Sequence, residues 1–272
     1  MMRTILKVAA IAAGLNGVGF GSAAAQGLPD DIVHATLRGG WQTASGSQMT
    51  ALHLTLAPGW KTYWRAPGDS GIPPRFDWSG SENIAGVTFH WPIPEVFDLN
   101  GLRTIGYKHE LVLPIELHPV TVGKPFLVAA EVQLGVCEEI CVPISLTLTA
   151  QPDASAKQDP VISAALAHAP QSAAQAGLTA ARCAAEPIRD GLRLTAGLTL
   201  PQLGPREFAV IELADETVWV SPADTERSGG QLTAVSDLVP PNAQPFALDR
   251  SSVRITVFGG SGRVVDLQGC TG

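Results

Sequence analysis

Residues 126–148 read FLVAAEVQLGVCEEICVPISLTL, and this stretch decides the fold of the first half of the chain. Its two apolar runs, 126–136 and 142–148, are rich in β-branched and aliphatic residues and favour strands. Three residues separate the cysteines at the inner ends of these runs, and three-residue loops are common in β-hairpins. The stretch therefore predicts a hairpin whose loop is 138–140.

The spacing of Cys137 and Cys141 requires the chain to turn between them if they are bonded. On one continuous strand, four steps of about 3.3 Å would hold their Cα atoms about 13 Å apart, whereas a disulfide needs about 4.4–6.8 Å. A hairpin places the two cysteines opposite each other at its tip. A single helical turn would also bring them close, but Gly135 and Pro143 disfavour a longer helix there.

The rest of the chain predicts a mainly β protein of two immunoglobulin-like β-sandwich domains. Only 16% of the 272 residues are charged and Gly and Pro number 28 and 21, which favours turn-rich β-structure over a helix bundle. Alternating or apolar runs predict further strands at 49–56, 111–117, 192–200, 208–213, 217–220, 231–238 and 253–258. A long segment between Trp60 and Trp91 contains Ala66-Pro67-Gly68-Asp69 and is expected to be irregular.

Composition also predicts the domain boundaries. Residues 151–181 are rich in Ala, Gln and Ser and predict a linker with one short helix near 161–168. The expected first domain is 26–150 and the second is 182–272.

The first 25 residues predict a secretory signal peptide. Arg3 and Lys7 form its basic end, residues 8–20 are apolar or small, and cleavage is expected near Ala25. A membrane anchor is the alternative, but the apolar run is shorter than the ~20 residues that a span needs. We therefore expect a periplasmic protein with no membrane span in the mature chain. The full sequence has a net charge of −7 and no apparent basic patch for nucleic acid, so no nucleic-acid partner is expected.

Export to an oxidising compartment favours disulfides for all four cysteines. For Cys137 and Cys141 the functional interpretation is a redox-active disulfide. A static hairpin staple and a metal site are the alternatives, although no second Cys or His pair with zinc spacing lies nearby. Cys183 and Cys270 bracket the second domain, where a bond over about 88 residues would stabilise by about 4–5 kcal/mol, so a structural disulfide is expected. No cofactor is expected.

Other side chains near these motifs have ordinary explanations. Five aromatic residues gather in the first domain and are expected mostly to pack in the core, although some could cover the cysteine pair: Trp60, Tyr63, Trp64, Trp78 and Trp91. Glu138 and Glu139 are most simply a solvated turn, but like-charge repulsion could raise the pKa of the neighbouring thiols.

Two stretches carry a family resemblance. Residues 59–78 read GWKTYWRAPGDSGIPPRFDW and residues 135–143 read GVCEEICVP, with Gly106-Tyr107-Lys108 and Leu113-Pro114 between them. Together they resemble the periplasmic amino-terminal domain of DsbD-type thiol:disulfide interchange proteins, in the branch that includes the ScsB-like suppressors of copper sensitivity. The resemblance covers about residues 28–150.

The resemblance implies an immunoglobulin-like domain that accepts electrons from a membrane protein and passes them to oxidised periplasmic proteins. It implies that Cys141 exchanges with partners and Cys137 resolves, although the cysteines of better-known members are spaced further apart. A protective loop is a further family feature, expected here at 65–74. The family's multispan membrane domain and thioredoxin-like domain do not occur in this sequence, so a separate membrane electron donor is expected.

The competing hypothesis is a copper-handling or adaptor module whose cysteines bind metal or only staple a loop. Soft thiolate ligands suit Cu(I). The redox hypothesis expects a reducible Cys137–Cys141 bond beside an inert Cys183–Cys270 bond, whereas an adaptor would keep both bonds inert.

Overall fold

The computed structural model describes residues 32–153, 155–260 and 262–272. The predicted signal peptide, with its cleavage site near Ala25, lies outside the described residues. Within the described ranges, no helix is long and apolar enough to cross a membrane.

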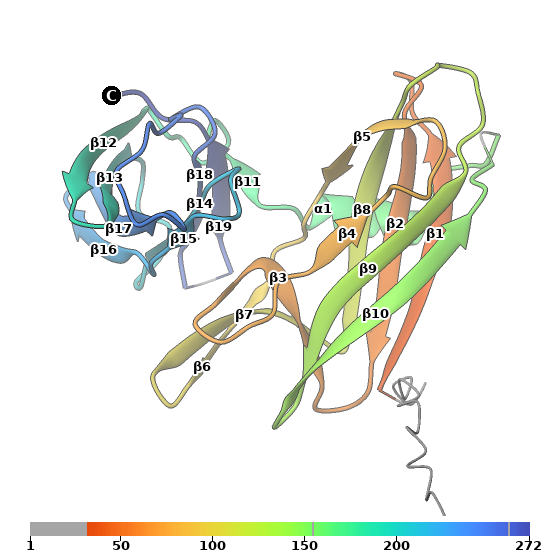
Figure 1. Cartoon of the computed structure of the whole chain (residues 1–272), viewed down its shortest axis with the longest axis horizontal. Coiled ribbons are helices and arrows are strands. Elements are labelled where there is room, and N and C mark those ends of the chain that lie inside the picture. The colour runs from red at the N-terminus through yellow and green to blue at the C-terminus, as the bar shows by residue number, and fades with distance from the viewer. Residues whose placement is uncertain (1–31, 154, 261) are drawn as a thin grey trace, which may run out of the picture.

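The first domain is a β-sandwich, drawn in red to green in Figure 1. One sheet has the order β1-β2-β8-β5, and the other has the order β10-β9-β3-β7-β6 with β4 also paired to β9. The strands are β1 (Val33–Gln42), β2 (Gln48–Leu56), β3 (Lys61–Gly68), β4 (Arg75–Asp77), β5 (Ile84–Phe89), β6 (Glu95–Leu99), β7 (Leu102–Lys108), β8 (Glu110–Pro119), β9 (Val128–Cys137) and β10 (Cys141–Ala150).

Strand alternation builds the core between these sheets. In β9, four alternate residues are at most 3% exposed: Val128, Ala130, Val132 and Leu134. The residues between them point away from the core, because successive side chains of a strand face opposite sides. Burying each of the Val and Leu side chains contributes about 1.5–3 kcal/mol, which fixes the register of the ribbon that ends in the two cysteines.

The second domain is also a sandwich, with sheet orders β11-β19-β18-β14 and β12-β13-β17-β15 and with β16 paired to β17. Its strands are β11 (Gln171–Ser172), β12 (Ala180–Ile188), β13 (Gly191–Thr199), β14 (Phe208–Glu212), β15 (Trp219–Val220), β16 (Asp224–Ser228), β17 (Gln231–Val239), β18 (Arg254–Phe258) and β19 (Val264–Gln268). The prediction of a mainly β chain with two β-sandwiches is confirmed.

One helix, α1 (Pro160–Ala167), joins the domains close to its predicted position. The Asp159 carboxylate caps it by accepting from the backbone N–H groups of Val161 and Ile162, and it also pairs with Arg38 at 2.8 Å. Ile162 is fully buried in a cluster with Trp41 and neighbouring residues of the first domain. Because of these contacts, α1 is packed against the first sandwich. The predicted linker 151–181 contains more than this helix, because β11 and the start of β12 also fall within it.

The expectation of one long irregular segment between Trp60 and Trp91 was wrong where β3, β4 and β5 lie within it, whereas residues 69–74, which include Ile72-Pro73-Pro74, form no strand or helix. Pro67 is accommodated in β3 because the β3–β7 ladder shifts register between Tyr63 and Gly68, so the missing N–H of Pro67 removes no bond from that ladder. Gly68 has φ +83°, and a Cβ there would collide with the Arg103 carbonyl oxygen.

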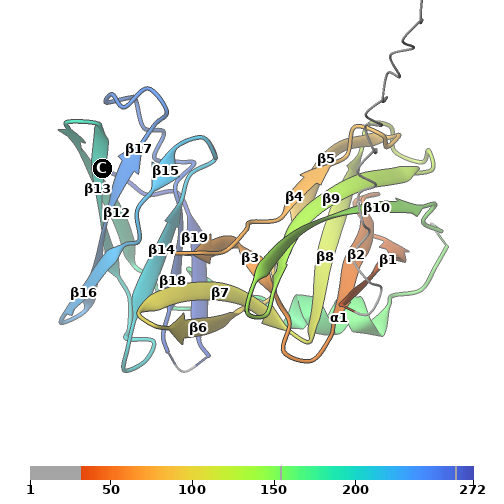
Figure 2. The same cartoon turned by 60° about the horizontal axis from the view of Figure 1, so that its bottom comes forward.

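The two sandwiches meet where β3 and β7 face β14, β18 and β19 (Figure 2). The Trp64 ring makes an edge contact with the Phe258 ring at 5.6 Å between centroids. The buried Arg65 side chain donates to Glu212 at 2.9 Å and lies 3.4 Å from an Asp266 carboxylate oxygen. A ring contact and a buried ion-pair cluster therefore connect the domains directly, beyond the chain that links them.

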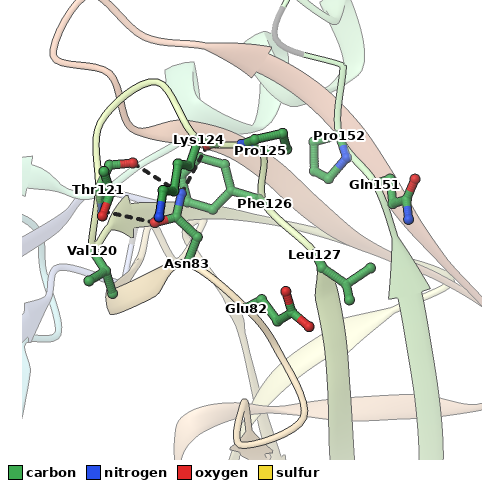
Figure 3. A pocket seen from close by; sticks show the side chains of 10 residues that line it. All are labelled: Glu82, Asn83, Val120, Thr121, Lys124, Pro125, Phe126, Leu127, Gln151 and Pro152. Carbon is green, nitrogen blue, oxygen red and sulfur yellow. Dashed lines mark hydrogen bonds between the residues drawn. The ribbon is translucent and has the colours of Figure 1, made fainter.

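An open hollow of about 750 Å³ lies at the other end of the first domain from the cysteines (Figure 3). It is shaped by Asn83, whose amide donates to the carbonyl oxygens of Thr121 and Lys124. Leu127, on its wall, directly precedes β9, and Cys137 ends that strand, about 30 Å away at the usual rise per residue. The hollow is therefore separate from the site described next.

Candidate functional site

The two cysteines face each other at the tip of the β9–β10 hairpin. Cys137 and Cys141 are register partners, their Cα atoms are 4.2 Å apart, and a disulfide joins them. The loop between them is 138–140, as expected, and the Glu138 N–H donates to the Ile140 carbonyl oxygen at 3.3 Å. The hairpin tip lies at the bottom of Figure 1.

The two cysteines differ in their access to solvent. Cys137 is only 1% exposed, whereas Cys141 is exposed. Ile140 is 71% exposed beside Cys141 and places an apolar side chain at the same tip. An incoming partner therefore meets Cys141 before Cys137.

A tyrosine hydroxyl touches both sulfurs. The hydroxyl oxygen of Tyr63 lies 2.9 Å from Cys137 Sγ and 3.2 Å from Cys141 Sγ. The side chain comes from β3, is only 2% exposed, and burial raises the pKa of its hydroxyl. Tyr63 is therefore a neutral donor aimed at the disulfide. The sequence grouped it with the core aromatics, and only its polar hydroxyl could have set it apart from the neighbouring tryptophans.

Part of the predicted covering loop does lie over this site. A Cβ atom on Gly71 would stand 2.7 Å from Cδ1 of Tyr63, and one on Gly135 would stand 2.7 Å from Cβ of Ile72. The chain at 71–72 therefore passes over the tyrosine ring and over the strand that leads to Cys137. Arg65, at the other end of the predicted loop, instead binds Glu212 in the second domain.

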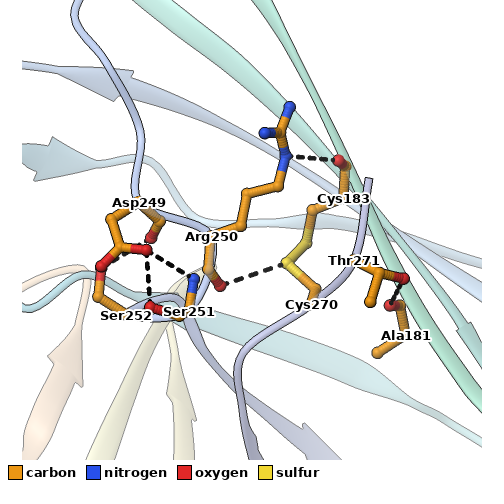
Figure 4. Close-up of a disulfide and its surroundings, with 8 residues drawn as sticks. All are labelled: Ala181, Cys183, Asp249, Arg250, Ser251, Ser252, Cys270 and Thr271. Carbon is orange, nitrogen blue, oxygen red and sulfur yellow. Dashed lines mark hydrogen bonds between the residues drawn. A yellow bond between two sulfur atoms is a disulfide. The ribbon is translucent and has the colours of Figure 1, made fainter.

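The second disulfide joins Cys183 of β12 to Cys270, which follows β19 (Figure 4). Hydrogen bonds hold the backbone around it: the Cys183 N–H donates to the Thr271 carbonyl oxygen at 2.6 Å, and the Arg250 side chain donates to the Cys183 carbonyl oxygen at 3.0 Å. The Arg250 carbonyl oxygen lies 3.8 Å from Cys270 Sγ. Cys183 is 1% exposed. The bond fastens the end of the chain to the edge of a sheet.

In the described parts of the chain, no group of three or more His, Cys, Asp or Glu side chains is arranged to hold a metal ion.

A comparison with protein families decides how the first sandwich is classified. Residues 35–152 match the family model described as "Thiol:disulfide interchange protein DsbD, N-terminal". Residues 35–152 form a DsbD-like N-terminal domain. The matched range runs from β1 to the residues after β10 and includes the whole cysteine hairpin. The resemblance inferred from the sequence is thereby confirmed for this domain.

A solved structure extends the likeness of fold beyond the DsbD-like domain. The N-terminal periplasmic domain of ScsB from Proteus mirabilis superposes with a TM-score of 0.60 at 24% identity, and the match covers 88% of this chain and 93% of that one. Because the coverage is nearly complete, the shared fold includes the second sandwich. Among curated proteins, no sequence matches this chain.

Proposed function

We propose that this chain is a periplasmic thiol:disulfide oxidoreductase that relays electrons from a separate membrane reductase to oxidised periplasmic proteins. The observation that carries the proposal is a disulfide with one exposed and one buried cysteine, at the tip of a DsbD-like hairpin and in contact with a tyrosine hydroxyl. The predicted signal peptide, the two disulfides and the periplasmic ScsB domain of similar fold support the location. In this proposal residues 26–150 carry the exchange, 182–272 support it, and 151–181 join them.

The proposed cycle moves two electrons through Cys141. A thiolate of the donor attacks Cys141 Sγ and releases Cys137 as a thiolate, and the second donor thiol then resolves the mixed disulfide. The donor leaves as a disulfide, and this chain is left with two thiols. Cys141 next attacks a disulfide of the client and releases one client thiolate. Cys137 attacks Cys141, restores the internal disulfide and releases the second client thiol, and the thiolates take up protons from solvent.

The different exposure of the two cysteines gives each sulfur its own role in the proposed cycle. Cys141 is accessible and makes the intermolecular bond, whereas Cys137 is covered and lies opposite, ready to resolve it. The Tyr63 hydroxyl can donate to whichever sulfur becomes a thiolate, because it contacts both. Glu138 and Glu139 disfavour a thiolate at this tip by charge repulsion, so exchange with small disulfides should be slow until a partner docks.

The test is to trap the mixed disulfide. Cys137→Ala leaves Cys141 without its resolving thiol, so incubation of the reduced variant with oxidised periplasmic extract should accumulate adducts on non-reducing gels. Cys141→Ala should trap little, because Cys137 is covered, and the wild-type chain should resolve its adducts. Equal trapping by both variants would overturn the assigned order. No trapping by either would favour the adaptor hypothesis, as would equal resistance of the two disulfides to reduction.

A further inference from the structure

Four neighbouring strands carry one row of register partners that runs from two lysines to the two cysteines. Lys108 of β7 pairs with Lys61 of β3, Lys61 pairs with Cys137 of β9, and Cys137 pairs with Cys141 of β10. Residues directly opposite each other in a sheet project their side chains to the same face. Both ammonium groups are therefore on the face of the sheet that carries the disulfide.

An aromatic ring holds these lysines in place. The Nζ atoms of Lys61 and Lys108 lie 5.1 Å and 4.6 Å from the centre of the Phe97 ring. Phe97 of β6 pairs with Thr104 of β7, and Lys61 Nζ also donates to the Thr104 hydroxyl at 3.4 Å. Two positive charges thus share one ring, an arrangement that is attractive for each cation and repulsive between them.

No carboxylate of the described residues forms an ion pair with either lysine, whereas Arg65, Arg193 and Arg254 all have such partners. The Glu138 carboxylate is turned toward Gly59, where an added Cβ would collide with it. Burial, and then repulsion from Lys108, lower the pKa of Lys61, so a nearby anion would stabilise the charged pair. Within a chain of net charge −7, the two lysines place positive charge in the row of residues that leads to the disulfide, whereas Glu138 and Glu139 place negative charge at the hairpin tip itself.

We propose that Lys61 and Lys108 bind carboxylate side chains of the protein partner whose cysteines exchange with Cys141. The inference rests on the proposed function and adds the chemistry of the partner. Strands lie about 4.8 Å apart, so the lysines stand two and three strands from Cys141, or about 10 and 14 Å. An extended partner segment rises about 3.4 Å per residue and only its alternate side chains share a face, so its acidic residues should lie two and four residues from its reactive cysteine, about 7 and 14 Å along the segment.

The experiment uses three synthetic peptides, each with one cysteine blocked as a mixed disulfide with a coloured aromatic thiol. They carry Glu, Gln or Lys at the second and fourth positions from the cysteine, which share a face in an extended peptide, and are otherwise identical. The chain with Cys137 and Cys141 reduced is mixed with each peptide, and the release of the coloured thiol gives the rate. At low salt the Glu peptide should react about tenfold faster than the Gln peptide and the Lys peptide more slowly, with the differences shrinking as salt is added.

The Lys61→Gln/Lys108→Gln variant should react at similar rates with all three peptides. Lys124→Gln/Lys157→Gln removes the same charge away from the cysteine row and should keep the preference of the wild type. Absence of a preference in the wild type would overturn the inference. Equal slowing of all three peptides in the Lys61/Lys108 variant would also overturn it, because the lysines would then act on the chain's own thiolate. If no peptide released its thiol from the wild type while Cys137→Ala still trapped proteins of the periplasmic extract, only this inference would fail; if neither reaction occurred, the proposed function would fail as well.

Discussion

The two disulfides of this chain differ in how much sequence they enclose and in where they lie. Cys137 and Cys141 are four residues apart and close the tip of one hairpin, whereas Cys183 and Cys270 are 87 residues apart and close the second domain. The short bond has one exposed member, and the long bond secures the C-terminal segment against β12. A cross-link over a long loop is expected to stabilise more than one over a short loop, so the short bond has less structural reason to exist.

The contacts made by the residues around the two disulfides also differ. At the short bond, the Tyr63 hydroxyl contacts both sulfur atoms, and the chain at 71–72 lies over the Tyr63 ring. Around the long bond, hydrogen bonds fix the backbone of Cys183 and Cys270, and the printed contact to sulfur is a backbone one, from the Arg250 carbonyl oxygen 3.8 Å from Cys270 Sγ. Under the proposed function, a side-chain hydroxyl in contact with both sulfurs, and not the presence of a bond, would distinguish the exchanging disulfide from the structural one.

The largest expected effect concerns the long loop. Cys183→Ala/Cys270→Ala should lower the free energy of unfolding by about 4–5 kcal/mol, whereas Cys137→Ala/Cys141→Ala should lower it by about 2 kcal/mol, because the shorter cross-link restricts the unfolded chain less. Urea unfolding of the two variants and the wild type, followed by tryptophan fluorescence, measures both losses. A larger loss from the short bond would reverse the comparison.

The buried cluster between the domains should give the next largest effect. Glu212→Ala leaves Arg65 buried with Asp266 as its remaining carboxylate partner, and loss of one member of a buried pair should cost about 3 kcal/mol. Asp237→Ala, which breaks the exposed pair with Arg193, is the control and should cost at most about 1 kcal/mol. Calorimetry should show the domains unfolding in separate transitions in the Glu212 variant, and one unchanged transition would contradict the coupling.

Tyr63→Phe tests whether the hydroxyl acts on the sulfurs. A hydrogen bond to a charged group contributes about 1.5–3 kcal/mol, so loss of this donor should raise the pKa of the reactive thiol by about one unit or more. The ultraviolet absorbance of the thiolate, followed against pH in the reduced chain, measures the shift. Tyr107→Phe removes the other tyrosine hydroxyl, which donates to the Pro92 carbonyl oxygen, and should leave the thiol unchanged. Equal shifts in both variants would assign the effect to packing.

The smallest expected effect concerns residues 71–72, the segment that covers the Tyr63 ring. Gly71→Ala adds a Cβ close to the Tyr63 ring, and overpacking by about 1 kcal/mol should open the cover about fivefold more often. Reduction of Cys137–Cys141 by a small dithiol should accelerate by a similar factor, while Cys183–Cys270 is unaffected. Gly230→Ala, where an added Cβ meets no atom within 4 Å, is the control. No acceleration in the Gly71 variant would show that 71–72 does not limit access.

The sequence determined the features that depend on neighbours along the chain. The apolar runs 126–136 and 142–148 predicted two strands, and the three residues between the cysteines predicted the hairpin that brings them together. Asp159 and Pro160 could similarly begin a short helix with local contacts alone. The local rule that Pro and Gly interrupt a strand failed at Pro67 and Gly68, because a register shift in β3 accommodates both residues.

Only the tertiary structure decided what surrounds the cysteines. Tyr63 reaches Cys137 across 74 residues of sequence, and Arg65 reaches Glu212 across 147. Alternation tells which side chains of β3 share a face, but it does not tell which strand β3 pairs with or in what register. That register follows from how both sheets bury their apolar faces together, a property of the whole chain. The sequence by itself therefore determined the disulfide-bearing hairpin, and the packing of distant strands placed the hydroxyl, the cover and the two lysines around it.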